Sequence, residues 1–152
     1  MWLGIVAGLF QEGLKYFFVR RRTLKEGLFV GLGFGVGEAV IIPIIGIVNA
    51  ALMSLPAGVS YLPFVERALA TLFHAGTGLT LAYFYRKGRG LHALIVISAI
   101  HGLIDTFAAH YQLTASTADL WISYALLAAF SLLLLRPLGE AKREVEERKV
   151  VW

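Results

Sequence analysis

Several ionisable side chains occupy apolar stretches of this sequence, where a charge is costly and therefore signals a function. Glu38, His74 and His101 lie on separate stretches. Glu38 follows Glu26 by 12 residues, His74 precedes Arg86 by 12, and His101 follows Arg89 by 12, and these three charged residues are expected at the same membrane surface. At a helical rise of about 1.5 Å, 12 residues cover roughly 18 Å, close to the middle of a bilayer. We therefore expect these three side chains to meet at one depth.

Two imidazoles and a carboxylate that meet in a dry environment can bind a divalent metal or activate water. Asp105 follows His101 by one helical turn and adds a second carboxylate on the same face. This mixture of nitrogen and oxygen donors favours zinc as the cofactor, with Glu38, His74, His101 and Asp105 as its ligands. The alternative is a set of interhelical hydrogen bonds that only holds helices together.

Two further cations and their acidic neighbours are expected to support this site. Glu12 and Lys15 stand at i and i+3 on the first stretch, which predicts an ion pair on one helix face. Glu66 and Arg67 lie near the other end of the third stretch, and we expect Arg67 to form a structural ion pair. Lys15 and Arg67 are thus assigned structural roles around the site.

The elements that must position these residues are hydrophobic helices. The chain is 58% hydrophobic and only 16% charged, which is typical of a membrane protein. The sequence predicts an all-α, polytopic transmembrane helical bundle of about five spans, over residues 1–136, followed by a charged tail helix over residues 137–152. The apolar stretches are Met1–Val19, Gly27–Ser54, Tyr61–Tyr85, Leu91–Tyr111 and Leu120–Leu135.

The second stretch carries Gly27, Gly31 and Gly35 at intervals of four residues. Such a row of small residues lies on one face of a helix and lets a neighbouring helix approach closely. Pro43 in the same stretch predicts a kink or a tilt.

The basic residues indicate how the bundle is oriented. They cluster after the first, third and fifth stretches, whereas residues 55–63 and 112–119 contain no Lys or Arg. By the positive-inside rule, these clusters face the cytoplasm, so the amino terminus lies outside and the carboxyl terminus inside the cell membrane. The net charge of +4 therefore indicates contact with the lipid bilayer and not with nucleic acid.

The order of the motifs resembles that of the CAAX-protease and bacteriocin-processing superfamily of intramembrane proteases, nearest to its YhfC-type metalloprotease and PrsW-type branches. The matching pieces span residues 11–105. They are Gln11-Glu12-Gly13-Leu14-Lys15, Gly33-Phe34-Gly35-Val36-Gly37-Glu38, Glu66-Arg67 with His74, and His101-Gly102-Leu103-Ile104-Asp105.

This resemblance implies hydrolysis of a peptide bond in a membrane-protein or peptide substrate. Glu12 or Glu38 would activate water, and His74 would position the water or bind a metal. His101 and Asp105 would stabilise the oxyanion or complete a metal site. The sequence departs from the family pattern in two places, because Gln11 replaces a glutamate and Asp105 stands where many relatives carry Asn.

Two other functions remain open at this point. The polar centre could bind or carry a divalent ion or small solute in a cavity without catalysis, and the small-residue rows would suit a homo-oligomer. In the plainest alternative, the polar residues only specify the packing of a helical bundle.

Overall fold

The computed structural model describes residues 2–53 and 61–149, and these fold entirely into helices and the turns that join them. The predicted all-α class is confirmed. Met1, Ser54 and residues 150–152 of the predicted tail helix lie outside the described residues. The helices are α1 (Trp2–Val19), α2 (Leu24–Leu52), α3 (Leu62–Arg86), α4 (Gly90–Thr114), α5 (Thr117–Leu134) and α6 (Leu138–Lys149).

Local signals explain where several helices begin. Thr23 accepts a hydrogen bond from the Glu26 backbone and the Glu26 side chain accepts one in return, which makes a capping box at the start of α2. Ser116 caps α5 through the Asp119 backbone. Pro63 occupies the first turn of α3, where its missing N–H costs nothing.

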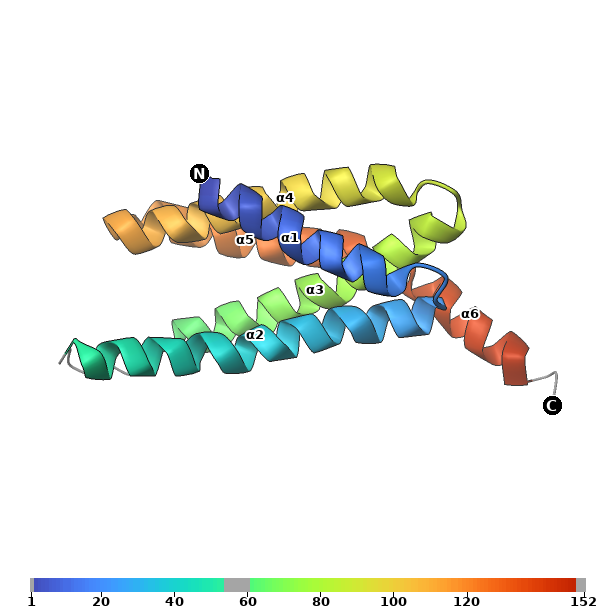
Figure 1. The fold of residues 1–152 in the computed structure, drawn as a ribbon, viewed down its shortest axis with the longest axis horizontal. Helices are drawn as coiled ribbons and strands as arrows, with labels where there is room; N and C mark the ends of the chain where they lie inside the picture. The colour runs from blue at the N-terminus through green and yellow to red at the C-terminus, as the bar shows by residue number, and fades with distance from the viewer. Residues whose placement is uncertain (1, 54–60, 150–152) are drawn as a thin grey trace.

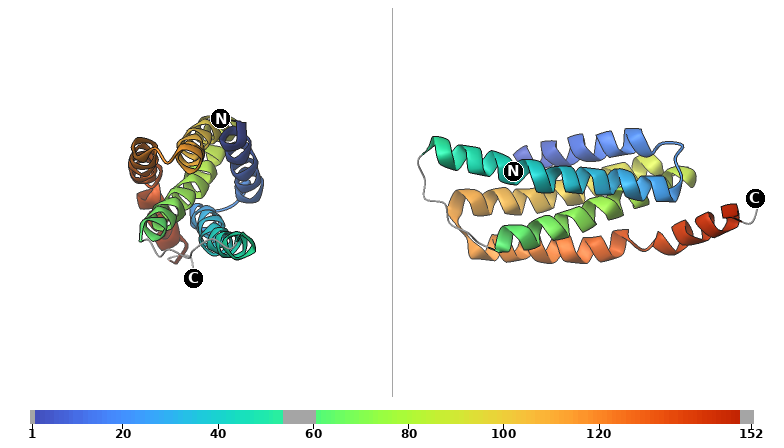
Figure 2. Two further views of the ribbon diagram at one scale, coloured as in Figure 1. Left: turned by 90° about the vertical axis from the view of Figure 1, so that its left-hand side faces the viewer. Right: turned by 90° about the horizontal axis from the view of Figure 1, so that it is seen from below.

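The helix α3 lies at the centre of the bundle (Figures 1 and 2). It packs against α1, α2, α4 and α5, while α1 packs along α4. Phe73, Leu79 and Leu81 of α3 are almost completely buried and form part of the apolar core. A side chain placed on this helix can therefore meet groups from every other long helix.

Within residues 2–53 and 61–149, three stretches are long and apolar enough to cross a membrane, fewer than the five spans predicted: Leu24–Leu52, Gly90–Thr114 and Thr117–Glu147, the last running from α5 into α6. The second half of α2 exposes apolar side chains on all sides, among them Ile41, Ile44, Ile45, Ile47 and Val48. A helix that is apolar on every side is stable only inside a larger core or in a bilayer.

The glycine row of α2 does permit a close helix contact. A Cβ atom on Gly31 would lie 2.0 Å from the His74 carbonyl oxygen, and one on Gly27 or Gly35 would also collide with α3. Gly33, on another face, has nothing within 4 Å of that position. The close approach therefore fixes the register between Glu38 on α2 and His74 on α3.

The predicted basic segments gather at one end of the molecule. The α1–α2 turn, the α3–α4 turn and α6 lie together there, opposite the α4–α5 turn (Figure 1). At this end Glu144 of α6 accepts a hydrogen bond from the Leu24 backbone at 3.0 Å and pairs with Arg86 at 2.9 Å. The charged tail helix thus packs where α2 begins and α3 ends.

Candidate functional site

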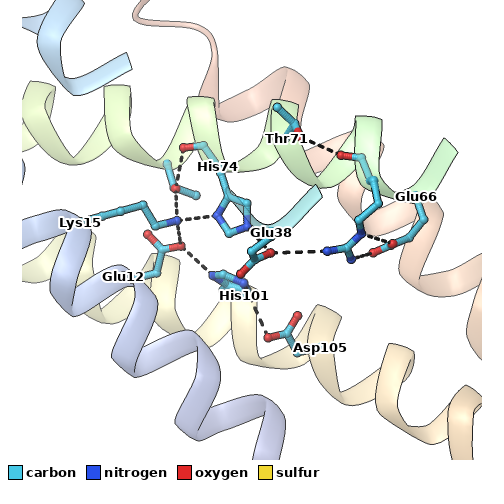
Figure 3. A network of polar contacts seen from close by, with 10 residues as sticks. Glu12, Lys15, Glu38, Glu66, Thr71, His74, His101 and Asp105 are labelled. Atoms are coloured by element: carbon cyan, nitrogen blue, oxygen red, sulfur yellow. Dashed lines mark hydrogen bonds and ion pairs between the residues drawn. The ribbon is translucent and has the colours of Figure 1, made fainter. Parts of the chain in front are cut away.

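The three residues expected at a common depth do meet. The Glu38 carboxylate lies 3.0 Å from Nε2 of His74. The rings of His74 and His101 stand edge to face with centroids 5.2 Å apart. Figure 3 shows the three side chains converging from α2, α3 and α4. The predicted convergence is therefore confirmed.

Behind this cluster lies a second group that is sealed from solvent. Glu12 and Lys15 of α1 are both fully buried and pair at 2.5 Å, as their spacing predicted. The Lys15 ammonium also contacts Nδ1 of His74 at 2.8 Å and the Thr77 hydroxyl at 2.7 Å. Lys15 thus links α1 to α3 through two polar contacts, to His74 and Thr77 (Figure 3).

Thr77 was missed by the sequence analysis. It is fully buried and lies one turn after His74 on the same face of α3, where its hydroxyl also donates to the His74 carbonyl. The i, i+3 spacing from His74 is a signal that could have revealed it. Serine and threonine hydroxyls are common in membrane helices, so Thr77 could be recognised as part of a site only from its spacing to His74.

The contacts of His74 define the roles of its two ring nitrogens. An ammonium group can only donate hydrogen bonds, so Nδ1 of His74 accepts from Lys15. The ring proton must then be on Nε2, which donates to the Glu38 carboxylate. His74 therefore orients Glu38, and Lys15 keeps His74 in that tautomer.

A second imidazole is oriented in a similar way. Nδ1 of His101 lies 2.7 Å from Oε1 of Glu12, and a carboxylate accepts the hydrogen of this bond. Nε2 of His101 then points away from Glu12 and stands 3.6 Å from Oδ2 of Asp105, one turn further along α4. A histidine held by a buried carboxylate on one nitrogen presents the other nitrogen to a ligand in a fixed direction.

Arg67 lies beside Glu38 on the side of the site nearest the start of α3. It pairs with Glu66 through two short contacts, which agrees with the structural ion pair expected for it. Its Nη1 lies 3.6 Å from the Glu38 carboxylate and is buried without a hydrogen-bond partner among the described residues. This guanidinium therefore retains a donor beside Glu38.

A cavity of about 410 Å³ gives access to these groups. Its polar wall contains Glu38, His74, His101 and Asp105, whereas Glu12 and Lys15 lie behind that wall. Towards the α4–α5 turn the lining is formed by Tyr111, Gln112 and Tyr124 among others. The cavity therefore leads from the site toward the end of the bundle opposite the basic turns, and is large enough for water and a few residues of peptide.

The donor atoms can be compared with the needs of a metal ion. Glu12, His74 and His101 offer one ligand atom each within 4.8 Å of one another, a spacing that could hold a metal. Lys15, however, already contacts both Glu12 and His74, so a cation there would meet an ammonium. On the cavity side, Glu38, His101 and Asp105 line the wall, but among the described residues they do not form a group of such spacing.

No protein-family model, no curated protein and no solved structure matches the chain. The functional conclusions therefore depend on the residues themselves and on the order of their motifs.

Proposed function

We propose that this chain is an intramembrane hydrolase of peptide bonds, a five-span protein of the cell membrane with its amino terminus outside and its carboxyl terminus in the cytoplasm. One observation carries the proposal: Glu38 is held by His74 at 3.0 Å on the wall of a cavity that also presents His101 and Asp105. The motif order shared with the CAAX-protease and bacteriocin-processing superfamily supports the same activity.

In the proposed reaction Glu38 is the general base. It takes a proton from a water molecule in the cavity as the water oxygen attacks the peptide carbonyl carbon. The developing oxyanion needs donors, and Nε2 of His101, whose ring lies between Glu12 and Asp105, would provide one if the ring carried a proton on both nitrogens. Glu38 then passes the proton to the leaving nitrogen as the C–N bond breaks, giving one carboxylic acid and one amine.

A divalent ion is compatible with this chemistry. Glu38, His101 and Asp105 on the cavity wall would have to draw closer together to hold it, and zinc is the ion that such oxygen and nitrogen donors suit. Such an ion polarises a bound carbonyl and lowers the pKa of a bound water. His74 would keep its role of orienting Glu38 through Nε2–H.

The first prediction tests Glu38 as the base. In liposomes that contain a panel of fluorescently tagged single-span proteins, we expect Glu38→Gln to reduce cleavage by about 100-fold or more, the value of a general base. Glu147→Gln on α6, far from the cavity, is the matched control and should cleave like wild type. Equal cleavage by Glu38→Gln and wild type would reject the proposal. A parallel assay with a zinc chelator shows whether the cleavage activity needs the ion.

A second function is favoured by the Glu12, His74 and His101 group, whose spacing could hold a metal. In this alternative, the chain binds or carries a divalent ion through the cavity without hydrolysis. It predicts zinc uptake into liposomes by wild type, reduced in His101→Gln, with no cleavage of any protein in the panel.

A further inference from the structure

A hollow of about 600 Å³ lies apart from the candidate site, between α3, α4 and the end of α5. It shares no lining residue with the cavity that contains Glu38. We call it the α3–α4 hollow, and its walls include Thr80, Ala93, Ile97 and Leu134. Its volume is in the range of sites that bind small molecules.

Most of the α3–α4 hollow is apolar. Ala93, Ile97 and Leu134 belong to the buried core, and Val96 at the rim is 57% exposed. The polar atom of Thr80 is already used, because its hydroxyl donates to the Leu134 carbonyl at 2.6 Å. These walls therefore suit the hydrocarbon part of a ligand.

Two polar side chains line the hollow where α4 begins, at the basic end of the molecule (Figure 1). Arg89 directly precedes α4 and His92 lies in its first turn, and both are exposed. Neither side chain forms an ion pair or a hydrogen bond with the part of the chain that the structure describes, whereas nearby Arg86 pairs with Glu144 at 2.9 Å. The Arg89 guanidinium therefore presents a charge that no carboxylate opposes.

The extent of the hollow matches one leaflet of a bilayer. From His92 to Ile100, the first and last α4 residues of its lining, the helix rises about 12 Å. The hydrocarbon of one leaflet is about 15 Å thick, half of the bilayer core. In the proposed orientation the α3–α4 turn faces the cytoplasm, where the leaflet carries anionic lipids.

We infer that the α3–α4 hollow binds an anionic phospholipid of the inner leaflet, with its phosphate at Arg89 and His92 and one acyl chain along Ala93 and Ile97. A guanidinium can donate two parallel hydrogen bonds to phosphate oxygens. A zwitterionic lipid would bring a second cation beside the same guanidinium, so an anionic headgroup is preferred. This binding does not depend on the proposed hydrolysis.

The second prediction is a preference for an anionic headgroup. The full chain in a neutral detergent is titrated with phosphatidylglycerol or with phosphatidylcholine of the same acyl chains, and native mass spectrometry gives the Kd of the first bound lipid. We expect wild type to bind phosphatidylglycerol about ten-fold more tightly, the value of one charge-assisted hydrogen bond. Equal affinities would overturn the inference.

Arg89→Gln tests where the headgroup lies. It should abolish the preference for phosphatidylglycerol, and because Arg89 is exposed the variant should fold normally. Lys87→Gln is the matched control, since it removes one positive charge from the same turn but lies outside the hollow. It should keep the preference. An equal loss in both variants would mean that only the total charge of the turn attracts the lipid, and would reject the site.

The acyl chain is tested by filling the hollow. Ala93→Phe should weaken phosphatidylglycerol binding about ten-fold, whereas Ala99→Phe, at an exposed position of α4 outside the hollow, should not. Glycerol phosphate, which has a phosphate but no acyl chain, should bind more weakly than the lipid. Unchanged lipid binding by Ala93→Phe, or glycerol phosphate bound as tightly as the lipid, would overturn the place assigned to the acyl chain.

Discussion

At the scale of single residues, Lys15 supplies a buried ammonium group to the site. It contacts Glu12, His74 and Thr77, and through the first two it orients both imidazoles of the site. A buried ion pair contributes little net stability compared with a well-packed apolar pair, but removal of one partner leaves an isolated charge. The role of Lys15 can therefore be separated from simple packing by replacing it alone or together with Glu12.

The third prediction concerns this cation. Lys15→Met should lower the free energy of unfolding in detergent by about 3–5 kcal/mol, because Glu12 loses its counter-charge. Lys15→Met combined with Glu12→Gln should recover part of that loss. The measurement is equilibrium unfolding, and additive losses in the double variant would contradict the prediction.

The same variant carries a metal readout. With the ammonium gone, Glu12, His74 and His101 remain within the spacing that could hold an ion. Zinc should therefore raise the Tm of Lys15→Met more than that of wild type, since a ligand that binds only the folded state stabilises it.

The residues of the site differ in how far sequence alone could place them. The depth of Glu38, His74 and His101 was predictable because charged residues fix where each helix leaves the apolar region. The contact from Lys15 to His74 was not, because it depends on how α1 is rotated about its axis against α3. A spacing of three residues can reveal the partner on the same helix but not the partner on another.

At the scale of helices, the packing of α2 on α3 determines the geometry of the site. Gly31 lies against the backbone at His74 and Gly35 against Thr71, so the two helices are in close contact along this row up to one turn before Glu38. The sequence predicted the glycine row and the extents of the long helices to within a few residues. The sequence could not show whether the row of Gly27, Gly31 and Gly35 or the row of Gly33 and Gly37 faces α3. That choice depends on the rotation of α2 about its axis, and small residues on two faces of a helix suit either rotation.

The fourth prediction compares two glycines of this helix. Gly31→Ala should destabilise the protein by about 1–3 kcal/mol or more, because its Cβ would overlap the His74 carbonyl. Gly33→Ala, with open space at its Cβ, should be neutral or gain up to about 1 kcal/mol from helix propensity. Thermal unfolding in detergent measures both, and an equal response of the two variants would refute the assigned packing face.

At the scale of the whole molecule, the basic turns and α6 gather at one end, and the cavity leads toward the other (Figure 1). The positive-inside rule places the basic end in the cytoplasm. The proposed orientation therefore makes the cavity accessible from the outer half of the membrane.

The fifth prediction tests that orientation with single cysteines. Leu113→Cys, at a position that is 84% exposed near the α4–α5 turn, should react with a membrane-impermeant maleimide on intact cells. Gly139→Cys on α6, where nothing lies within 4 Å of the added Cβ, should react only after lysis. The reverse labelling pattern would show that the bundle is inserted the other way up.

The attachment of α6 has a consequence for biosynthesis. The Leu24 amide at the start of α2 is satisfied by Glu144, 120 residues further along the chain. While the ribosome is still producing the intervening helices, that amide must rely on water at the membrane surface. The start of α2 therefore reaches its native bonding only after α6 has emerged from the exit tunnel, so a nascent chain arrested before Glu144 would expose an incomplete helix start to cellular quality control.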